Sequence, residues 1–259
     1  MKTVIATTTW YDGRKAADKV RLALACKMLK NVRHGGRHYP TVVLNGTKNR
    51  WMNQRLREAA DENAIIYPCT VPGMGPGRRL AFFYALTHLH ITLGQKDGVI
   101  LWTEPEKPGL IDCIGAIVRP IILGEADVVI PKRTEANFGT YPEWQAEIEH
   151  EYNSVYEEVT GRVGFDPAFG PVAFRASTLQ KLLFWNPVNA GLEDTYITHY
   201  LPILVRNERV TAVEVDVPYP ENQRLVEEKS KKRFYEKRLW QKATYIKAYR
   251  ALGPLPKLV

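Results

Sequence analysis

Short apolar segments alternate with helix-like segments through the first half of the chain. Five segments are rich in apolar and β-branched residues, as strands are: 3–9, 41–44, 64–67, 98–102 and 127–130. The segments between them repeat apolar residues at helical spacing, and turn signals such as Gly35-Gly36 separate the elements. Because these strands are apolar rather than alternating, the pattern predicts an α/β fold with a mostly parallel, Rossmann-like central sheet and helices on both faces.

The second half of the chain also contains helix-like and strand-like segments, but they do not alternate regularly. One amphipathic helix is expected over residues 144–159, and short strands over 171–175 and 213–217. Ser177 and Gln180 fit a capping box that opens another helix. We expect a single α/β domain over residues 1–223, with halves 1–133 and 134–223, followed by a basic helical extension over residues 224–259.

The positive charge of the chain is concentrated near its C-terminus. The net charge is +8, and residues 224–250 hold ten Lys or Arg against three Glu. Apolar residues at helical spacing, such as Tyr235, Leu239 and Ile246, predict a closing helix that packs on the domain and exposes a basic face. This segment could also dock to an anionic acceptor, a membrane surface or a nucleic acid.

Several protein classes are disfavoured. The apolar stretch 110–130 contains charged residues and a proline, which argues against a transmembrane helix, and the first residues are too short an apolar run for a signal peptide. The three cysteines have no Cys-x-x-Cys spacing, so buried free thiols in a reducing cytoplasm are expected. Without a Gly-x-Ser-x-Gly motif or a Cys–His arrangement, a serine or cysteine hydrolase is also disfavoured.

Polar and glycine-rich segments follow four of the predicted strands. They are residues 7–12, 45–46, 73–79 and 103–107. Because ligands of such sheets bind in the crevice at the carboxyl ends of the strands, we expect these segments to meet at one pocket.

Glu104-Pro105-Glu106 directly follows the apolar strand 98–102. Two carboxylates in a rigid loop at a strand end can hold a hard divalent cation, and such a cation could neutralise a diphosphate. The alternative is an exposed acidic loop, since Glu is common on surfaces.

Two further features could carry chemistry. The loop 73–77 is glycine-rich and precedes a helix whose first turn contains Arg78 and Arg79, which favours a nucleotide or phosphate role over a plain connector. Glu193 and Asp194 stand at an expected helix start, where a carboxylate could accept a proton from an acceptor hydroxyl or could simply complement the helix dipole.

The order of these motifs resembles that of GT-A nucleotide-diphospho-sugar glycosyltransferases. The resemblance extends over roughly residues 1–217 and lies in the order of the motifs rather than in any one of them. The matching segments are Thr7-Thr8-Thr9-Trp10, Asn45-Gly46-Thr47, Gly75-Pro76-Gly77-Arg78-Arg79, Glu104-Pro105-Glu106, Ala126-Asp127-Val128-Val129-Ile130, Phe169-Gly170-Pro171-Val172-Ala173-Phe174-Arg175 and Glu193-Asp194.

The resemblance implies an enzyme that moves a sugar from a nucleoside-diphosphate sugar to an acceptor hydroxyl. Residues 1–133 would be its nucleotide-binding half and 134–223 its acceptor half. The residues implied to bind the nucleotide are Thr8, Thr9, Trp10, Asn45, Gly46, Gly75, Gly77, Arg78 and Arg79. Glu104 and Glu106 would hold Mg²⁺ or Mn²⁺, Asp194 with Glu193 would supply the catalytic carboxylate, and Gly170 and Arg175 would shape the acceptor side.

The chain departs from the family pattern at the metal motif. Glu104-Pro105-Glu106 stands in place of Asp-x-Asp, and Tyr219-Pro220-Glu221-Asn222 stands where several such enzymes have a metal-binding histidine. Two other functions stay open. A sugar nucleotidyltransferase normally has its glycine-rich basic loop after the first strand, whereas here it follows the third. A non-enzymatic protein could bind a nucleotide or a nucleic acid through the basic C-terminal segment.

Overall fold

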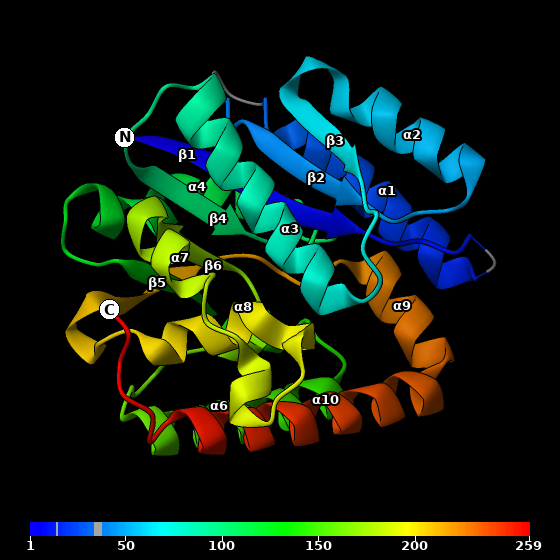
Figure 1. Cartoon of the computed structure of the whole chain (residues 1–259). Coiled ribbons are helices and arrows are strands. Elements are labelled where there is room, and N and C mark those ends of the chain that lie inside the picture. The colour runs from blue at the N-terminus through cyan, green and yellow to red at the C-terminus, as the bar shows by residue number, and fades with distance from the viewer. Residues whose placement is uncertain (14, 34–37) are drawn as a thin grey trace.

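The computed structural model of the chain describes residues 1–13, 15–33 and 38–259, and its fold is α/β with a seven-stranded central sheet (Figure 1). The turn predicted at Gly35-Gly36 lies outside these ranges. The strands are β1 Lys2–Thr9, β2 Thr41–Asn45, β3 Ala64–Pro68, β4 Gly98–Trp102, β5 Val128–Arg133, β6 Val172–Arg175 and β7 Val210–Val215. The helices are α1 Ala16–Asn31, α2 Arg50–Ala60, α3 Met74–Thr87, α4 Leu110–Ile122, α5 Glu135–Phe138, α6 Glu143–Thr160, α7 Ala176–Leu182, α8 Ile197–Tyr200, α9 Glu221–Lys229 and α10 Lys231–Leu252.

The strand order is β3-β2-β1-β4-β6-β5-β7. All neighbouring pairs are parallel except those of β6, which runs antiparallel to both β4 and β5. The predicted mostly parallel sheet is therefore confirmed. Because of this arrangement, the carboxyl ends of the other strands meet at one edge, whereas β6 begins there and ends at the opposite edge.

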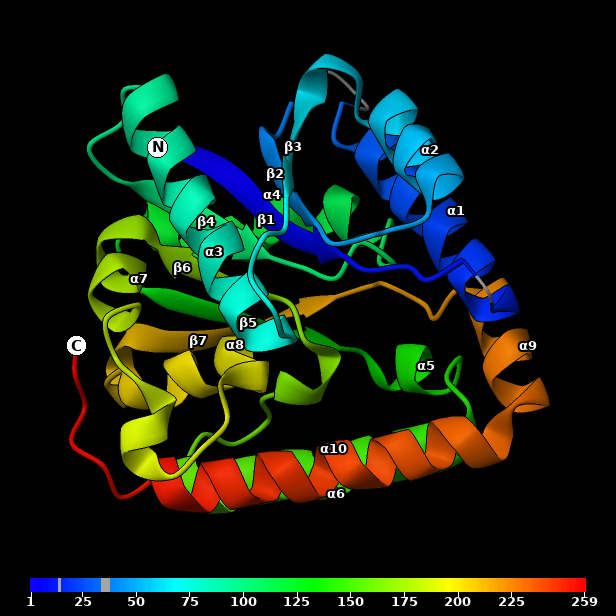
Figure 2. The ribbon, with the colours of Figure 1, turned by 45° about the vertical axis from the view of Figure 1, so that its right-hand side comes forward.

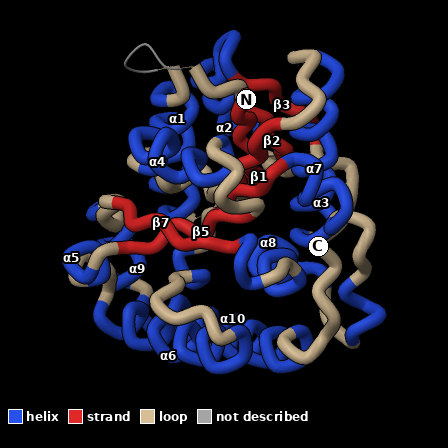
Figure 3. The backbone as a smooth tube through the Cα atoms, turned by 90° about the vertical axis from the view of Figure 1, so that its left-hand side faces the viewer, coloured by secondary structure: helices blue, strands red, loops and turns tan. Residues whose placement is uncertain are grey.

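Helices cover both faces of the sheet, as predicted (Figures 1 and 3). Side chains along a strand alternate between the faces, so in β1 Val4 and Ala6 pack with α3, while Ile5 packs with α1 and α4. Since both faces are buried, apolar side chains lie on both of them. No helix within the described ranges is long and apolar enough to cross a membrane.

The last helix, α10, lies alongside α6 on one side of the sheet (Figure 2). Three of its apolar side chains, Tyr245, Tyr249 and Leu252, are buried in the same core cluster as Tyr152 and Tyr156 of α6. The ring centroids of Tyr152 and Tyr245 are 5.0 Å apart, and those of Tyr156 and Tyr249 are 5.2 Å apart. The basic C-terminal segment thus contributes directly to the core.

Two local predictions are wrong. Ser177 does not cap α7, because the helix already includes it; its backbone N–H donates instead to Oδ1 of Asp97 at 3.2 Å, so that a residue preceding β4 caps α7. The three cysteines are free thiols, as expected, but they are partly exposed rather than buried.

Candidate functional site

A cavity of about 630 Å³ lies at the carboxyl edge of the sheet, and we call it the cleft. The turn after β4, the start of α3, the end of β5 and helices α1, α6, α9 and α10 line it. Its cationic residues are Lys15, Arg21, Lys27, Arg78, Lys107, Arg133, Arg233, Lys237 and Arg238, and its acidic residues are Asp18, Glu104, Glu106, Glu149, Glu221 and Glu227. Positive groups outnumber negative ones, which favours an anionic ligand.

Glu106, one of the two predicted metal ligands, is buried at the end of β4. Its Oε1 accepts a hydrogen bond from the hydroxyl of Tyr11 at 3.0 Å and lies 2.7 Å from Nη2 of Arg21. Burial, together with the charge of Glu106, raises the pKa of Tyr11 well above its ordinary value. The phenol therefore keeps its proton and acts as a donor, and the carboxylate is fixed to α1 and to the end of β1.

Glu104, the other predicted metal ligand, is paired with Lys107. Its Oε2 lies 3.0 Å from Nζ of Lys107. Burial raises the pKa of Glu104, but the charges of Lys107 and Arg78 outweigh burial and hold that pKa below its ordinary value. Burial in turn lowers the pKa of Lys107, and the charge of Glu104 outweighs it. Both groups are therefore ionised at neutral pH.

Gly170 brings the start of β6 against Glu104. Its φ is +99°, and a Cβ at this position would lie 2.5 Å from Oε1 of Glu104. Only glycine accommodates both the backbone conformation and this close approach. The structure thus brings together Gly170, predicted to shape the acceptor side, and Glu104, predicted to hold a metal.

Arg78 is buried at the start of α3 and lines the cleft. Its Nη1 donates to the carbonyl of Thr195 at 2.7 Å, and the guanidinium lies 5.4 Å from the ring centroids of both Trp102 and Tyr196. Its Nε has no hydrogen-bond partner, and Arg78 forms no ion pair with any carboxylate in the described part of the chain. A buried cation of this kind is ready to bind an anion.

His199 lies in the same cleft close to these cations. Burial and the charge of Arg78 lower the pKa of His199 to about 3. The imidazole is therefore neutral at physiological pH, and its Nε2 is hydrogen-bonded to the hydroxyl of Tyr245 at 3.2 Å. It can orient a ligand but adds no charge.

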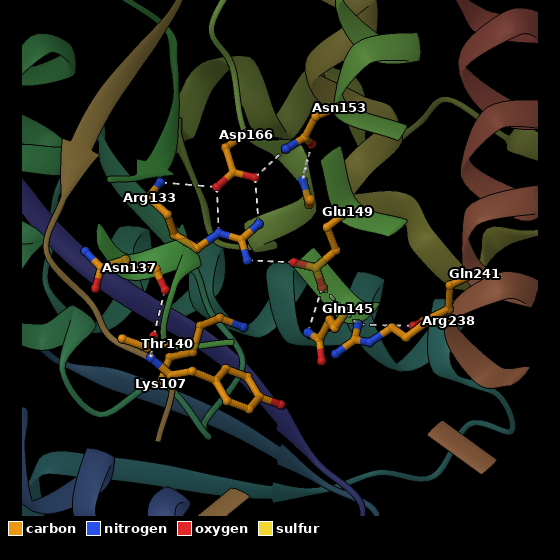
Figure 4. A network of polar contacts seen from close by, with 12 residues as sticks. Lys107, Arg133, Asn137, Thr140, Gln145, Glu149, Asn153, Asp166, Arg238 and Gln241 are labelled. Carbon is orange, nitrogen blue, oxygen red and sulfur yellow. Dashed lines mark hydrogen bonds and ion pairs between the residues drawn. The ribbon is translucent and has the colours of Figure 1, made fainter. Parts of the chain in front are cut away.

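A buried polar network centred on Arg133 contributes side chains to the lining of the cleft (Figure 4). The guanidinium of Arg133 binds Asp166 through Nε at 2.7 Å and Nη2 at 2.8 Å, and it binds Glu149 through Nη1 at 2.6 Å. Glu149 also lies 3.6 Å from Nη1 of Arg238, which comes from α10. The network holds two positive and two negative side chains, so it joins β5, α6 and α10 without adding net charge.

Most of the residues predicted to bind the nucleotide do not line the cleft. Arg78 does, whereas Thr8, Thr9, Trp10, Asn45, Gly46, Gly75, Gly77 and Arg79 lie outside its lining. At the ends of β1 and β2, Thr9 Oγ1 donates to Oδ1 of Asn45 at 2.9 Å, and Trp10 lies against Gly46 with its side chain half exposed. These residues form a separate cluster beside the cleft.

The structure does not place Asp194 in the lining of the cleft. Both of its carboxylate oxygens accept hydrogen bonds from Nε of Arg79, at 2.7 and 2.9 Å. Glu193 is exposed. Gly75 belongs to the same contact, because a Cβ there would lie 2.4 Å from the carbonyl of Asp194. This cluster fastens α3 to the segment that precedes α8.

Arg175, which the resemblance assigns to the acceptor side, does not line the cleft. It binds Asp127 at 2.9 Å and Asp97 at 3.3 Å, and these residues precede β5 and β4. The reason is the direction of β6: an antiparallel strand carries its last residue to the edge opposite the cleft, whereas Gly170, before its start, stays beside Glu104.

The two predicted metal ligands do not fit a divalent cation in this arrangement. Mg²⁺ and Mn²⁺ favour several oxygen ligands, but each of these carboxylates is already bound to a cationic side chain. Within the described ranges, no group of three His, Cys, Asp or Glu residues could hold a metal ion. We therefore derive no chemical step that uses a metal.

Sequence reasoning placed Tyr11 and Lys107 in segments expected at the pocket without giving them a role, and it missed Arg21 and the Arg133 network. Only Lys107 left a local signal, because it follows Glu104 by three residues and opposite charges at that spacing can pair. Arg21 and Arg133 meet their partners only through tertiary packing.

No protein-family model and no curated protein sequence matches the chain. Solved structures do share its fold. A mycobacterial protein superposes with a TM-score of 0.53 at 11% identity, covering 93% of this chain and 74% of its own. A protein assigned as a nucleotide-diphospho-sugar transferase in Desulfovibrio desulfuricans G20 gives 0.50 at 10% identity, with coverages of 96% and 99%.

A CMP:2-keto-3-deoxy-manno-octonic acid synthetase in complex with CTP also has a TM-score of 0.50, at 9% identity, covering 93% of this chain and all (100%) of its own. At these identities the likeness shows the fold alone. The chain has the GT-A-like fold of nucleotide-diphospho-sugar transferases, as the resemblance predicts.

Proposed function

We propose that this chain is a glycosyltransferase that takes a sugar from a nucleoside-diphosphate sugar and transfers it to an acceptor hydroxyl. The observation that carries this proposal is Arg78, a buried cation without a carboxylate partner in the described ranges, which lines a cleft at the carboxyl edge of a nucleotide-sugar transferase fold. A diphosphate is an anion of suitable charge and size for such a group.

In this proposal the diphosphate of the donor lies near Arg78, at the start of α3. The N-terminal end of a helix favours negative charge, and Gly73, which precedes α3, is exposed. As the bond to the sugar breaks, negative charge grows on the diphosphate, so a fixed cation stabilises the transition state more than the ground state.

The base of the nucleotide would lie toward the ends of β1 and β2. There Trp10 offers a half-exposed indole face beside Gly46, and the side chain of Asn45 is held in place by Thr9. Aromatic faces stack on nucleobases. The acceptor would then enter from the side of α9 and α10, where Arg233, Lys237 and Arg238 line the cleft and suit an anionic acceptor.

The group that removes the proton from the acceptor stays a prediction. Asp194 is bound by Arg79 and does not line the cleft. Glu193 is exposed to solvent.

A sugar nucleotidyltransferase is the second candidate, since a synthetase complexed with CTP has the same fold. The position of the glycine-rich segment favours the glycosyltransferase: it precedes α3, after the third strand, and not α1, after the first.

The experiment begins with the melting temperature of the protein in UDP, GDP, CDP, dTDP and ADP, each with Mn²⁺ or with EDTA. A nucleotide that binds the folded state raises the melting temperature. The matching nucleotide-sugar is then tested for release of the nucleoside diphosphate, and the matching triphosphate with a sugar phosphate for release of pyrophosphate.

We expect one base to be selected and the nucleoside diphosphate to be released, and Arg78→Gln to abolish both while the surface variant Arg55→Gln keeps them. Release of pyrophosphate would instead identify a nucleotidyltransferase. Absence of any shift in the whole panel would contradict both enzymatic candidates.

A further inference from the structure

Arginine and lysine side chains surround Glu104 and Glu106, the predicted metal ligands. Arg21 is bound to Glu106, Lys107 is bound to Glu104, and Arg78 lines the same cleft as these residues. These five side chains carry three positive charges and two negative ones. The turn after β4 therefore has a net charge of +1 before any ion is added.

A divalent cation between Glu104 and Glu106 would have to displace two ion pairs. Glu106 has a side chain only 8% exposed, and its Oε1 is shared by Tyr11 and Arg21. Removal of either pair would leave a cation without its partner beside an incoming dication. Like charges at this range repel each other strongly when they are shielded from water.

For a diphosphate, which is an anion, the same positive side chains are favourable. Arg78 has a guanidinium with an unpaired Nε, and the ammonium of Lys107 is tied to one oxygen of Glu104 and has further N–H donors to offer. Together these two side chains carry the same positive charge as one magnesium or manganese ion. Both line one cleft and both are positioned by packing, Arg78 against Trp102 and Tyr196, and Lys107 over Phe169 with its Nζ 5.3 Å from the ring centroid.

We propose that Arg78 and Lys107 take the place of the divalent cation, so that the chain binds the diphosphate of its donor without a metal. Glu104 and Glu106 then act as positioning residues: Glu104 orients Lys107 through their ion pair, and Glu106 fastens α1 to the turn after β4 through Arg21 and Tyr11. This inference rests on the proposed function, since it concerns the donor of that reaction.

The test measures binding of inorganic pyrophosphate and of the five nucleoside diphosphates by calorimetry, in EDTA and in Mn²⁺. We expect the affinity in EDTA to be within about twofold of that in Mn²⁺. Lys107→Gln should weaken binding of both pyrophosphate and the nucleotide at least tenfold, because it removes one of the two charges that contact the diphosphate.

Lys132→Gln is the matched control. It removes the same charge from a lysine that lies outside the cleft and pairs with Glu214 at 3.5 Å, and we expect unchanged binding. Because Lys107→Gln leaves Glu104 without its partner, the melting temperature of each variant is measured first, and Lys107→Arg is added as a variant that keeps the charge and should retain most of the affinity.

The outcomes separate this inference from the proposed function. Binding that requires Mn²⁺ would overturn the metal-free inference and leave the transferase standing. Metal-free binding that Lys107→Gln does not weaken would also overturn it. If neither pyrophosphate nor any nucleotide binds with or without Mn²⁺, the proposed function itself fails.

Discussion

Arg79 holds Asp194 through both of its carboxylate oxygens, with Nε 2.7 Å from Oδ2 and 2.9 Å from Oδ1. The same guanidinium donates to the carbonyls of Leu183 and Trp185, each at 2.9 Å. One side chain of α3 thus fixes the ends of the connection between α7 and α8. The carboxylate that the resemblance assigns to catalysis has a clear structural role.

Asp194→Asn is expected to lower the free energy of unfolding by about 1–3 kcal/mol, because a charged hydrogen-bond acceptor of Arg79 is lost in a site only one-fifth exposed. Urea titration measures this value. Arg79→Gln should cost a similar amount, since it removes the other half of the same contact. A stability of Asp194→Asn equal to that of the parent would contradict the structural role.

The same two variants test the catalytic prediction. If Asp194 accepts the proton of the acceptor, Asp194→Asn loses turnover much more than Arg79→Gln, while both variants still bind the nucleotide. If Asp194 only positions the segment before α8, both variants lose turnover to the same extent. Full activity in Asp194→Asn would eliminate it as the base.

His199 is expected to make the protein less stable as the pH falls below 6.5. Its pKa is about 3 in the folded state, against an ordinary value of 6.5, so between these values the unfolded chain binds a proton that the folded chain does not. The free energy of unfolding should fall by up to about 1.4 kcal/mol for each pH unit in this range.

Urea titrations of the parent and of His199→Gln at pH 7, 6 and 5 measure this slope. The variant should show a flatter dependence, although burial also lowers the pKa of His88 and some slope will remain. Parallel curves for parent and variant would show that His199 is protonated in the folded protein.

Asp166 is expected to be the most costly carboxylate to remove. It is buried, and it accepts hydrogen bonds from Arg133 and from Asn153 at 2.7 Å. Asp166→Asn leaves Arg133 with less negative charge around it, so the free energy of unfolding should fall by about 3–5 kcal/mol. Glu58→Gln, which breaks a surface pair with Arg55, should cost less than about 1 kcal/mol.

The same residue predicts a response to acid. Burial raises the pKa of Asp166, but Arg133 outweighs burial and brings that pKa below the ordinary 3.8. Its stabilising contribution is therefore complete above that value and is lost as the pH falls through the folded pKa. Chemical denaturation from pH 5 to pH 2.5 should show a smaller loss in Asp166→Asn than in the parent.

Gly46→Ala is expected to separate binding of the base from binding of the diphosphate. A Cβ at Gly46 would lie 2.3 Å from Cε3 of Trp10, so the indole must move. Both Gly46→Ala and Trp10→Ala should weaken the nucleoside diphosphate several-fold and leave pyrophosphate unaffected. Equal weakening of both ligands, or of neither, would show that Trp10 does not contact the base.

The sheet was largely readable from the sequence, because β4 is an uninterrupted apolar run that matches the predicted residues 98–102. The direction of β6 was not. The four residues of β6 carry no signal of whether the strand pairs parallel or antiparallel with its neighbours. Because β6 is antiparallel, Gly170 lies at the edge of the sheet that holds the cleft and Arg175 lies at the opposite edge.

The sequence predicts where the candidate site lies, but it does not predict which contacts the side chains make there. Strand ends locate Glu104, Glu106 and Arg78 at one edge of the sheet, as parallel topology requires. Their partners are set by packing: Tyr11 reaches Glu106 across a sequence separation of 95 residues. No local pattern shows that a carboxylate will meet an arginine rather than a metal.

The position of α10 also bears on how the protein matures on the ribosome. All seven strands have been synthesised by Val215, yet one wall of the cleft and four buried side chains of the core, those of Tyr245, Ala248, Tyr249 and Leu252, come from residues that emerge later. A nascent chain with a finished sheet therefore still exposes the apolar face of α6. Because α9 and α10 line the cleft, we expect the proposed donor to bind only after these helices have been synthesised and have docked.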